Sequence, residues 1–285
     1  MPTGTVATLS RRGVHFIGPN DGAMACNEHG PGRMSEPEEI VAAIDGLLSG
    51  RKAPSSKTLA GKKALVTSGP TREALDPVRY ISNHSSGKQG HAIAVALARL
   101  GAEVTLVSGP VSLADPPGVK TVRVDSADQM LAACQAAQKG AAVDVAVCAA
   151  AVADWKAAAP AASKIKKKAG AAPPSLALAP NPDILATLSK SGPRRPALVV
   201  GFAAETDELI ANARAKLKSK GCDWILANDV SPATGTFGGE RNTVHLVTAK
   251  GVEDWPTLAK DEVAERLADR IAGHLALPRT AQAAE

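Results

Sequence analysis

The chain has 285 residues, of which 45% are hydrophobic and only 2% aromatic, and its formal net charge at pH 7 is +5. This length allows one large α/β domain, or a domain with a smaller appendage. The positive charge favours an anionic partner, but a surface for single-stranded nucleic acid needs aromatic platforms for base stacking, which are scarce here. A small anionic ligand, such as a nucleotide or a phosphorylated metabolite, therefore fits the composition better than nucleic acid does.

The four cysteines and the distribution of apolar residues exclude several other classes. The cysteines lie far apart and form no CxxC or Cys/His spacing, so neither a zinc site nor a disulfide framework is indicated. No charged segment leads into an apolar run, and no apolar run approaches the ~18 residues of a membrane span. We expect a soluble, cytoplasmic protein without a membrane partner.

The first 60 residues differ in character from the rest. Gly, Pro, Asn and Asp crowd residues 15–39, which indicates loops. A helix is predicted at 37–48, with Ser35 as its N-cap. Residues 49–63 are typical of an exposed linker, so this part of the chain offers little material for a core.

From residue 63 onward, short apolar runs alternate with helical patterns. Strands are predicted at 63–68, 102–109, 119–124, 143–152, 197–205 and 222–229, with an added one at 242–248, and helices at 87–101, 126–140, 182–192, 207–221 and 260–275. Strands that alternate with helices pair in parallel through right-handed crossovers. The predicted fold is α/β, a Rossmann-like doubly wound, mainly parallel sheet with helices on both faces. Its ligand should lie at the carboxyl ends of the strands.

Two segments interrupt this alternation, residues 69–86 and residues 153–181. Both are longer than an ordinary connection between a strand and a helix. Loops of such length in compact domains usually serve as lids or binding loops. We therefore look for functional residues in these two segments first.

The segment RYISNHSSGKQG, residues 79–90, combines glycines with polar and basic residues before a helix. A Walker A loop requires GxxxxGK[ST], but Gln89 takes the Ser/Thr position and Ser82 that of the first Gly. A dinucleotide fingerprint requires GxGxxG directly after a strand. Here Ser85 replaces its first Gly, and about seventeen residues separate the motif from the strand. The segment fits neither standard phosphate loop.

Several other features allow two interpretations each. Gly90 could simply permit close packing of helix on sheet. The lysine run at 163–168 could be a solvated loop or a source of cations for a triphosphate. Asp183 could cap a helix or mark a helix N-terminus that receives an anion. Lys216 and Lys220 share one helix face, which is normally a solvated face.

The motifs taken together are more specific than any one of them. GPTREALDPVRYISNHSSGKQG, AAAVADW…KIKKK…NPDIL, VVGFAAET and ANDV occur in this order. They closely resemble phosphopantothenate–cysteine ligase, the synthetase half of the bacterial bifunctional coenzyme A biosynthesis protein. The resemblance begins near residue 60 and implies a ligase domain at 61–277, followed by a tail at 278–285.

The amino-terminal segment GPNDGAMACNEHGPGRMSEPEEI is similar to the end of a flavin-dependent phosphopantothenoylcysteine decarboxylase domain. Residues 1–60 would then be a remnant of that domain plus a linker. Cys26 matches the family's catalytic cysteine, although Asn27 stands where a Gly is expected. FMN is expected only with the missing upstream domain, and no decarboxylation is expected from this chain alone.

The resemblance implies that 4′-phosphopantothenate, L-cysteine and CTP are the substrates, with Mg²⁺, in a reaction that passes through an acyl-cytidylate. It assigns Lys164 to activation of the carboxylate, Asn83 to consumption of the intermediate, and Arg79 to a contact with the acyl phosphate or substrate. The residues alone do not distinguish CTP from ATP. The family also implies a homodimer. The nucleotide contacts that carry over are Cys148, Ala149, Ala150, Asp154, Lys164, Pro182, Asp183, Ile184, Leu185, Phe202, Lys216 and Lys220.

Two hypotheses of other classes stay open. An NAD-dependent oxidoreductase would share the predicted fold, and pyrophosphate release would distinguish the ligase from it. A non-catalytic nucleic-acid module would use the basic loop, and would show salt-sensitive oligonucleotide binding without nucleotide turnover. Composition alone does not exclude this module, but the order of the motifs argues against it, so we expect no nucleic acid.

Overall fold

The computed structural model divides into two units, Met1–Ser56 and Lys57–Glu285. It describes residues 8–9, 12, 14–18, 20–23, 29–48, 57–140, 142–166, 175–230 and 241–277. In the first unit, β1 (Asn20–Ala23) pairs in antiparallel fashion with β2 (His29–Arg33). We expected only loops here, but backbone hydrogen bonds form a ladder without requiring apolar side chains. Cys26 lies outside the described residues.

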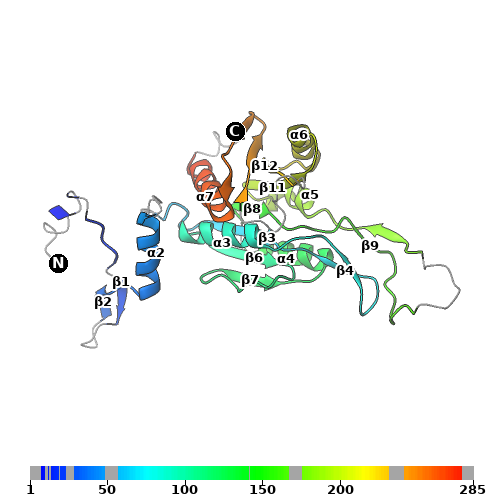
Figure 1. Cartoon of the computed structure of the whole chain (residues 1–285), viewed down its shortest axis with the longest axis horizontal. Coiled ribbons are helices and arrows are strands. Elements are labelled where there is room, and N and C mark those ends of the chain that lie inside the picture. Colours follow the sequence, from blue (N-terminus) through cyan, green and yellow to red (C-terminus); the bar gives the residue numbers. More distant parts are fainter. Residues whose placement is uncertain are drawn as a thin grey trace. The chain divides into compact units, whose positions relative to one another are not determined.

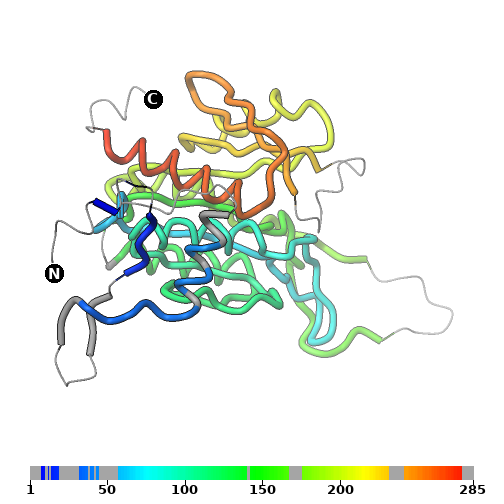
Figure 2. The backbone as a smooth tube through the Cα atoms, turned by 60° about the vertical axis from the view of Figure 1, so that its left-hand side comes forward, coloured from blue at the N-terminus to red at the C-terminus, as the bar shows by residue number. Residues whose placement is uncertain are grey.

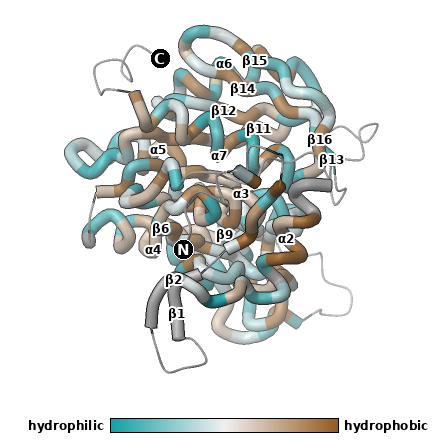
Figure 3. Tube along the Cα trace, turned by 90° about the vertical axis from the view of Figure 1, so that its left-hand side faces the viewer, coloured by the Kyte–Doolittle hydropathy of each residue, from teal (hydrophilic) through white to brown (hydrophobic). Residues whose placement is uncertain are grey.

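The predicted helix is confirmed as α2 (Pro37–Leu48). Its cap lies one residue later than predicted, because the backbone N–H of Glu36, not Ser35, donates to the Glu39 carboxylate at 2.9 Å. A carboxylate three residues into the helix that accepts from the cap backbone is half of a capping box. Val41 and Ile44 are exposed on this helix, and Figure 3 shows several strongly hydrophobic residues along it.

The second unit is built on an eight-stranded sheet in the order β15-β14-β12-β11-β8-β3-β6-β7. Its strands are β3 (Lys63–Ser68), β6 (Glu103–Ser108), β7 (Lys120–Arg123), β8 (Val145–Cys148), β11 (Leu198–Glu205), β12 (Trp224–Asp229), β14 (Val244–Thr248) and β15 (Val252–Asp254). The strands from β12 to β7 are all parallel, whereas β14 and β15 are added in antiparallel fashion. The predicted doubly wound, mainly parallel sheet is confirmed.

Helices cover both faces of the sheet, as Figures 1 and 2 show. They are α3 (Lys88–Arg99), α4 (Ala127–Gly140), α5 (Ile184–Ser189), α6 (Leu209–Lys220) and α7 (Lys260–Ala276). α3 and α7 pack side by side on one face, and α4, α5 and α6 cover the other. Successive strand residues alternate between these layers, so Val66 packs under α3 while Leu65 packs under α4.

Two helix ends show how local sequence sets the boundaries. Ser126 caps α4 as predicted, because its Oγ accepts the Gln129 N–H at 3.3 Å and Gln129 Oε1 accepts the Ser126 N–H at 3.4 Å. α5 is shorter than predicted and ends at Ser189. Gly192, at φ +61°, opens a 3₁₀ turn, η1 (Gly192–Arg194), that does not continue the α-helix.

Gly90 is required for the close packing of α3 on the sheet. A Cβ at this position would lie 2.5 Å from Ser68 Oγ and 2.6 Å from Ser68 Cβ. Only a glycine lets α3 approach β3 this closely, so close packing of helix on sheet accounts for it.

The two long loops each form an antiparallel hairpin. β4 (Arg72–Ala74) pairs with β5 (Tyr80–Ser82), and β9 (Trp155–Ala157) pairs with β10 (Leu178–Pro180). β4 contacts β9, and both hairpins reach out beyond the end of the sheet (Figure 1). A further short pair, β13 (Arg241–Asn242) with β16 (Leu258–Ala259), precedes α7. None of the helices in the described part of the chain has both the length and the hydropathy to cross a bilayer.

Candidate functional site

The strand order places a topological switch point between β3 and β8. From β3 the chain moves outward to β6 and β7, and then returns to β8 and moves the opposite way to β11 and β12. The connections that leave neighbouring strands in opposite directions open a crevice at their carboxyl ends, where open α/β sheets bind ligands. The loops that follow β3 and β8 therefore form the candidate site.

These two loops are held together by backbone and side-chain hydrogen bonds. The Ala151 N–H donates to the Gly69 carbonyl at 2.9 Å, and the Thr71 N–H donates to the Ala151 carbonyl at 3.4 Å. The Ala153 N–H donates to Thr71 Oγ1 at 3.1 Å. The parallel pairing of β3 and β8 thus continues past the strands, and this shared backbone forms a fixed floor for the candidate site.

Cys148, Ala149 and Ala150 lie on this floor, at the end of β8. The backbone N–H groups of Ala149 and Ala150 donate to the carbonyl and Oγ1 of Thr67, at 3.2 and 3.3 Å. They are therefore not free donors, and what these residues can offer a ligand is their carbonyl groups and small side chains. Burial raises the pKa of the Cys148 thiol well above its usual value, so this thiol stays neutral.

Asn83 directly follows β5 and is fixed against the loop after β8. Its Nδ2 donates to the Val152 carbonyl at 3.0 Å, and the neighbouring Ser82 Oγ donates to the Thr71 carbonyl at 2.7 Å. Asn83 is exposed, and its amide oxygen has no hydrogen bond to any described residue. The Nδ2 group thus fixes the side chain in place, and the Oδ1 atom is available to accept a hydrogen bond from a ligand.

Asp183 combines two roles at the start of α5. Its Oδ1 accepts the Ala186 N–H at 2.8 Å, which is an N-cap, and its Oδ2 accepts from Lys220 Nζ at 2.5 Å. Burial opposes the charged form, but the hydrogen bonds from Lys220 and Ala186 outweigh it, so the pKa of Asp183 is lowered. Asp183 is therefore an ionised cap that ties α5 to α6.

Lys216 lies in the same group of charges. Burial lowers its pKa, Glu205 raises it, Lys220 lowers it as a like charge, and Asp154 and Asp183 raise it. The fold therefore brings together four residues that the resemblance selected, and it adds Glu205 to them. The four are Asp154, Asp183, Lys216 and Lys220. The available signal for Glu205 was its place as the last residue of a predicted strand, at the carboxyl edge of the sheet.

The remaining predicted nucleotide contacts differ in burial and in the face of the sheet on which they lie. Ile184 and Leu185 are buried in the core, so they can meet a ligand only through their backbone, and Pro182 precedes them half-buried. Leu185 packs against Gly201, where a Cβ would lie 2.5 Å from its Cδ2. Phe202 packs on the α3 and α7 face, across the sheet from the lysines of α6. Its role in nucleotide binding stays a prediction.

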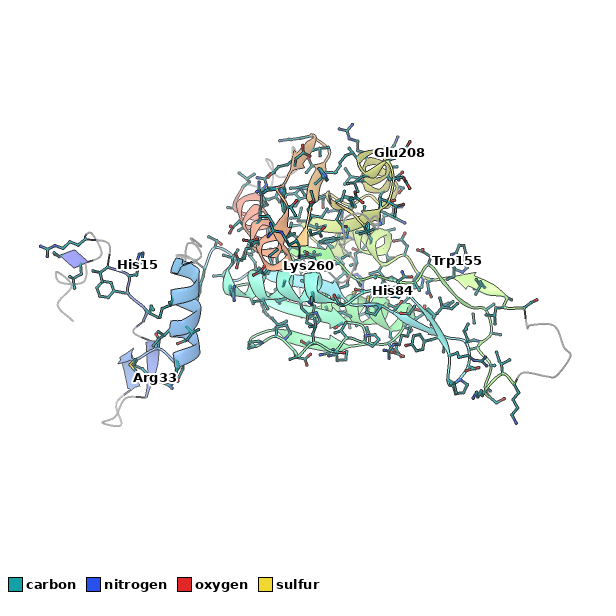
Figure 4. All side chains as sticks on the ribbon, in the orientation of Figure 1. His15, Arg33, His84, Trp155, Glu208 and Lys260 are labelled. Carbon is teal, nitrogen blue, oxygen red and sulfur yellow. The ribbon has the colours of Figure 1, made fainter. Side chains whose placement is uncertain are left out.

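Arg79 and Lys164 lie on the projecting hairpins. Arg79 Nε and Nη2 donate to Asp76 Oδ2 at 2.9 and 2.5 Å, and Nη2 also donates to the Ile165 carbonyl at 2.7 Å. Lys164, next to Ile165, is exposed and has no ion pair within the described residues. Figure 4 labels His84 and Trp155, neighbours of Asn83 and Asp154, on the side of the sheet from which the hairpins project. Sequence reasoning missed Asp76.

Among the described residues, no three His, Cys, Asp or Glu side chains lie close enough to hold a metal ion by themselves. Mg²⁺ is commonly bound by one or two carboxylates together with the phosphates of a substrate. Asp154 is exposed in the charged group, so its oxygen donors fit that kind of site. The three described cysteines, Cys134, Cys148 and Cys222, are free thiols.

The strand order and the group of charged residues around Lys216 define a Rossmann-like α/β protein with its candidate site at the carboxyl ends of the strands. Residues 59–275 match the family of the DNA/pantothenate metabolism flavoprotein C-terminal domain. The chain belongs to this family, and the resemblance that the motifs predicted is confirmed.

Several curated relatives carry the name coenzyme A biosynthesis bifunctional protein CoaBC. The one from Escherichia coli K12 is 45% identical over 264 residues, which are 92% of this chain and 63% of that protein. The one from Mycolicibacterium smegmatis is 43% identical over 280 residues, 95% of this chain and 66% of that protein. The chain spans roughly three fifths of the length of such relatives.

Solved structures agree with the fold. A crystal structure of the C-terminal domain of a coenzyme A biosynthesis bifunctional protein CoaBC is 39% identical, with a TM-score of 0.64, and the match covers 77% of this chain and 98% of that one. The DNA/pantothenate metabolism flavoprotein from Streptococcus pneumoniae is 25% identical, with a TM-score of 0.62, over 75% and 99% of the two chains. A Cab2 mutant in complex with phosphopantothenate-cysteine shares the fold at 19% identity and a TM-score of 0.57, over 82% and 96%.

Proposed function

We propose that the chain is an acid–amino acid ligase of coenzyme A biosynthesis. It joins 4′-phosphopantothenate to L-cysteine with CTP and gives phosphopantothenoylcysteine, CMP and pyrophosphate. The observation that carries the proposal is that Asn83 is held by Val152 in the loop after β8, the same loop that supplies Asp154 to the group of acids and lysines around Lys216. The relatives named for coenzyme A biosynthesis support the pathway.

In the first step, a carboxylate oxygen of phosphopantothenate attacks the α-phosphorus of CTP. The bond from that phosphorus to the bridging oxygen breaks, and pyrophosphate leaves from an acyl-cytidylate. A carboxylate that approaches a polyanion requires fixed positive charge. Lys216 and Lys220 supply it at the crevice, and Lys164 supplies it from the hairpins.

A Mg²⁺ ion on the phosphates, with Asp154 as a protein ligand, would neutralise part of the triphosphate charge. The protein's own residues do the rest of the positioning. Asp183 holds Lys220 in place through its ionised carboxylate. This pair sets where one ammonium group meets the nucleotide.

In the second step, the cysteine amine attacks the activated carbonyl carbon. The carbon–oxygen bond to the phosphate breaks, CMP leaves, and the nitrogen loses a proton. Asn83 can orient the carbonyl without attacking it, because an amide is a poor nucleophile. Cys148 also cannot compete with the substrate amine, since its thiol is held neutral.

We also propose that the chain works as a homodimer. Exposed apolar side chains that gather in one region mark an interaction surface. Large apolar side chains are exposed on the two hairpins, which contact each other through β4 and β9. They are Val78, Tyr80, Trp155, Leu176 and Leu178, each 47–59% exposed. A second copy of the chain is the partner that would cover them.

The test follows pyrophosphate release with phosphopantothenate, cysteine, Mg²⁺ and either CTP or ATP. Release is expected with CTP and only when phosphopantothenate is present. Lys164→Gln should suppress it, whereas Lys218→Gln, an exposed lysine of α6, should not. An absence of release with both nucleotides would overturn the proposed function.

A further inference from the structure

Asp76 is a fully buried carboxylate in the turn of the β4–β5 hairpin, and the reaction scheme above gives it no role. Its side chain has 0% exposure. Oδ1 accepts the N–H groups of Val78 and Arg79, at 2.8 and 2.9 Å. Oδ2 accepts from Arg79 Nε and Nη2 and from the Ile165 N–H, the last at 3.1 Å. One carboxylate thus receives five hydrogen bonds.

The three bonds to Oδ2 fix the position of the lysine segment at 163–166, because one comes from the Ile165 N–H and the other two hold the Arg79 side chain, which also contacts Ile165. Ile165 is held at both of its backbone groups, since its N–H donates to Asp76 and its carbonyl accepts from Arg79 at 2.7 Å. Ile165 stands between the exposed residues Lys164 and Lys166. Asp76, Arg79 and Ile165 therefore form a clip that joins the hairpin turn to a segment 89 residues further along the chain.

We propose that Asp76 is a positioning residue, which sets the place of Lys164 by locking Arg79 and Ile165 in this clip. The inference rests on the proposed function, because it gives the position of Lys164 a purpose. It also refines the role expected for Arg79. Its Nε and Nη2 hold the clip, and its Nη1, which has no hydrogen bond to a described residue, is left for a substrate anion.

The negative charge of Asp76 is essential to this arrangement. The hydrogen bonds from Arg79 lower the pKa of its carboxyl group well below the usual range, against the effect of burial, so it stays ionised. In Asp76→Asn, one acceptor oxygen becomes an NH₂ donor that faces other donors. Either two or three of the five bonds are then lost, depending on which way the amide turns.

The first test measures the clip without any activity. Amide hydrogen exchange at Ile165 should become at least about tenfold faster in Asp76→Ala, because this N–H then loses its acceptor altogether. Asp115→Ala is the control, since Asp115 also pairs with an arginine, but that arginine, Arg123, belongs to β7 and not to either hairpin. Unchanged exchange at Ile165 in a folded Asp76→Ala variant would overturn the clip.

The second test measures its consequence. Asp76→Asn should lower kcat for pyrophosphate release about 10- to 100-fold, with a less than roughly threefold change in the nucleotide KM. In the Lys164→Gln background it should have little further effect, because both changes remove the same contribution. A merely structural role would instead lower stability and add its full factor in that background, and this result would refute the inference.

Two further arms keep the outcomes distinct. Arg79→Lys keeps the charge but cannot donate from two nitrogens in one plane, so it should give an intermediate loss if Asp76→Asn fails to fold. If the parent releases no pyrophosphate with CTP or ATP, the proposed function fails, and the role assigned to Asp76 fails with it. Exchange at Ile165 then still shows whether the clip itself exists.

Discussion

Replacement of Gly90 by Ala tests the close approach of α3 to β3. The added Cβ would lie 2.6 Å from Ser68 Cβ, whereas carbon atoms in contact are about 3.5–4.0 Å apart. Either α3 moves away from the sheet by about 1 Å, or Ser68 shifts and weakens its bonds to the Gly87 carbonyl and His91 Nδ1. Overpacking of this kind costs about 1–3 kcal/mol.

Alanine also gains about 1 kcal/mol over glycine inside a helix, which reduces the net loss to at most about 2 kcal/mol. Gly273 supplies the matched control. It lies in α7, is exposed, and an added Cβ there would meet nothing within 4 Å. Gly273→Ala should therefore show the helix gain alone.

Thermal unfolding compares the two variants with the parent. For a unit of this size, 1 kcal/mol shifts Tm by about 2–4 °C, so Gly90→Ala should lower Tm by up to about 8 °C and Gly273→Ala should raise it by about 2–4 °C. Both variants carry the same Gly→Ala change within a helix, so Tm shifts of opposite sign would come from the difference in packing around the two sites. If both variants raise Tm equally, the packing argument is wrong.

Three other predictions concern single side chains. Burial lowers the pKa of His91 below its usual value of 6.5, against the hydrogen bond to Gly87, while Arg123 lowers it and Asp115 raises it. The unfolded chain then takes up a proton that the folded chain does not, so stability is lost as the pH falls from about 6.5 through the folded pKa. His91→Gln should weaken the pH dependence of the urea unfolding midpoint over this window. A pH dependence equal to that of the parent would show that His91 is not the group responsible. Lys220→Met should raise the nucleotide KM roughly tenfold, whereas Lys218→Met should not; equal effects would argue against a nucleotide contact. Trp155→Ser should shift the mass measured by light scattering from dimer toward monomer, and a monomeric parent would remove the basis of the homodimer proposal.

Much of the fold was predictable because strand residues and helix caps are local signals. The alternation of Val66 and Leu65 between two helix layers, and the cap at Ser126, follow from neighbouring residues. The end of α5 was missed because the left-handed conformation of Gly192 competes with a helical pattern that continues past Ser189.

The site was predictable only in part, because its contacts join distant segments. Family motifs selected Asp183 and Lys220, and the fold pairs them across 37 residues. No local pattern singled out Asp76, whose partner Ile165 is 89 residues away. The side of the sheet on which Phe202 lies depends on strand register, which the motif alone does not reveal.

In the proposed mechanism, Asn83 acts only after the carboxylate has been activated. The most direct measurement incubates Asn83→Ala with phosphopantothenate, CTP, Mg²⁺ and cysteine, and identifies the products by mass spectrometry. We expect pyrophosphate and an accumulating phosphopantothenoyl-cytidylate, with little phosphopantothenoylcysteine. Parent-like formation of phosphopantothenoylcysteine by this variant, or pyrophosphate release without any acyl-cytidylate, would contradict it.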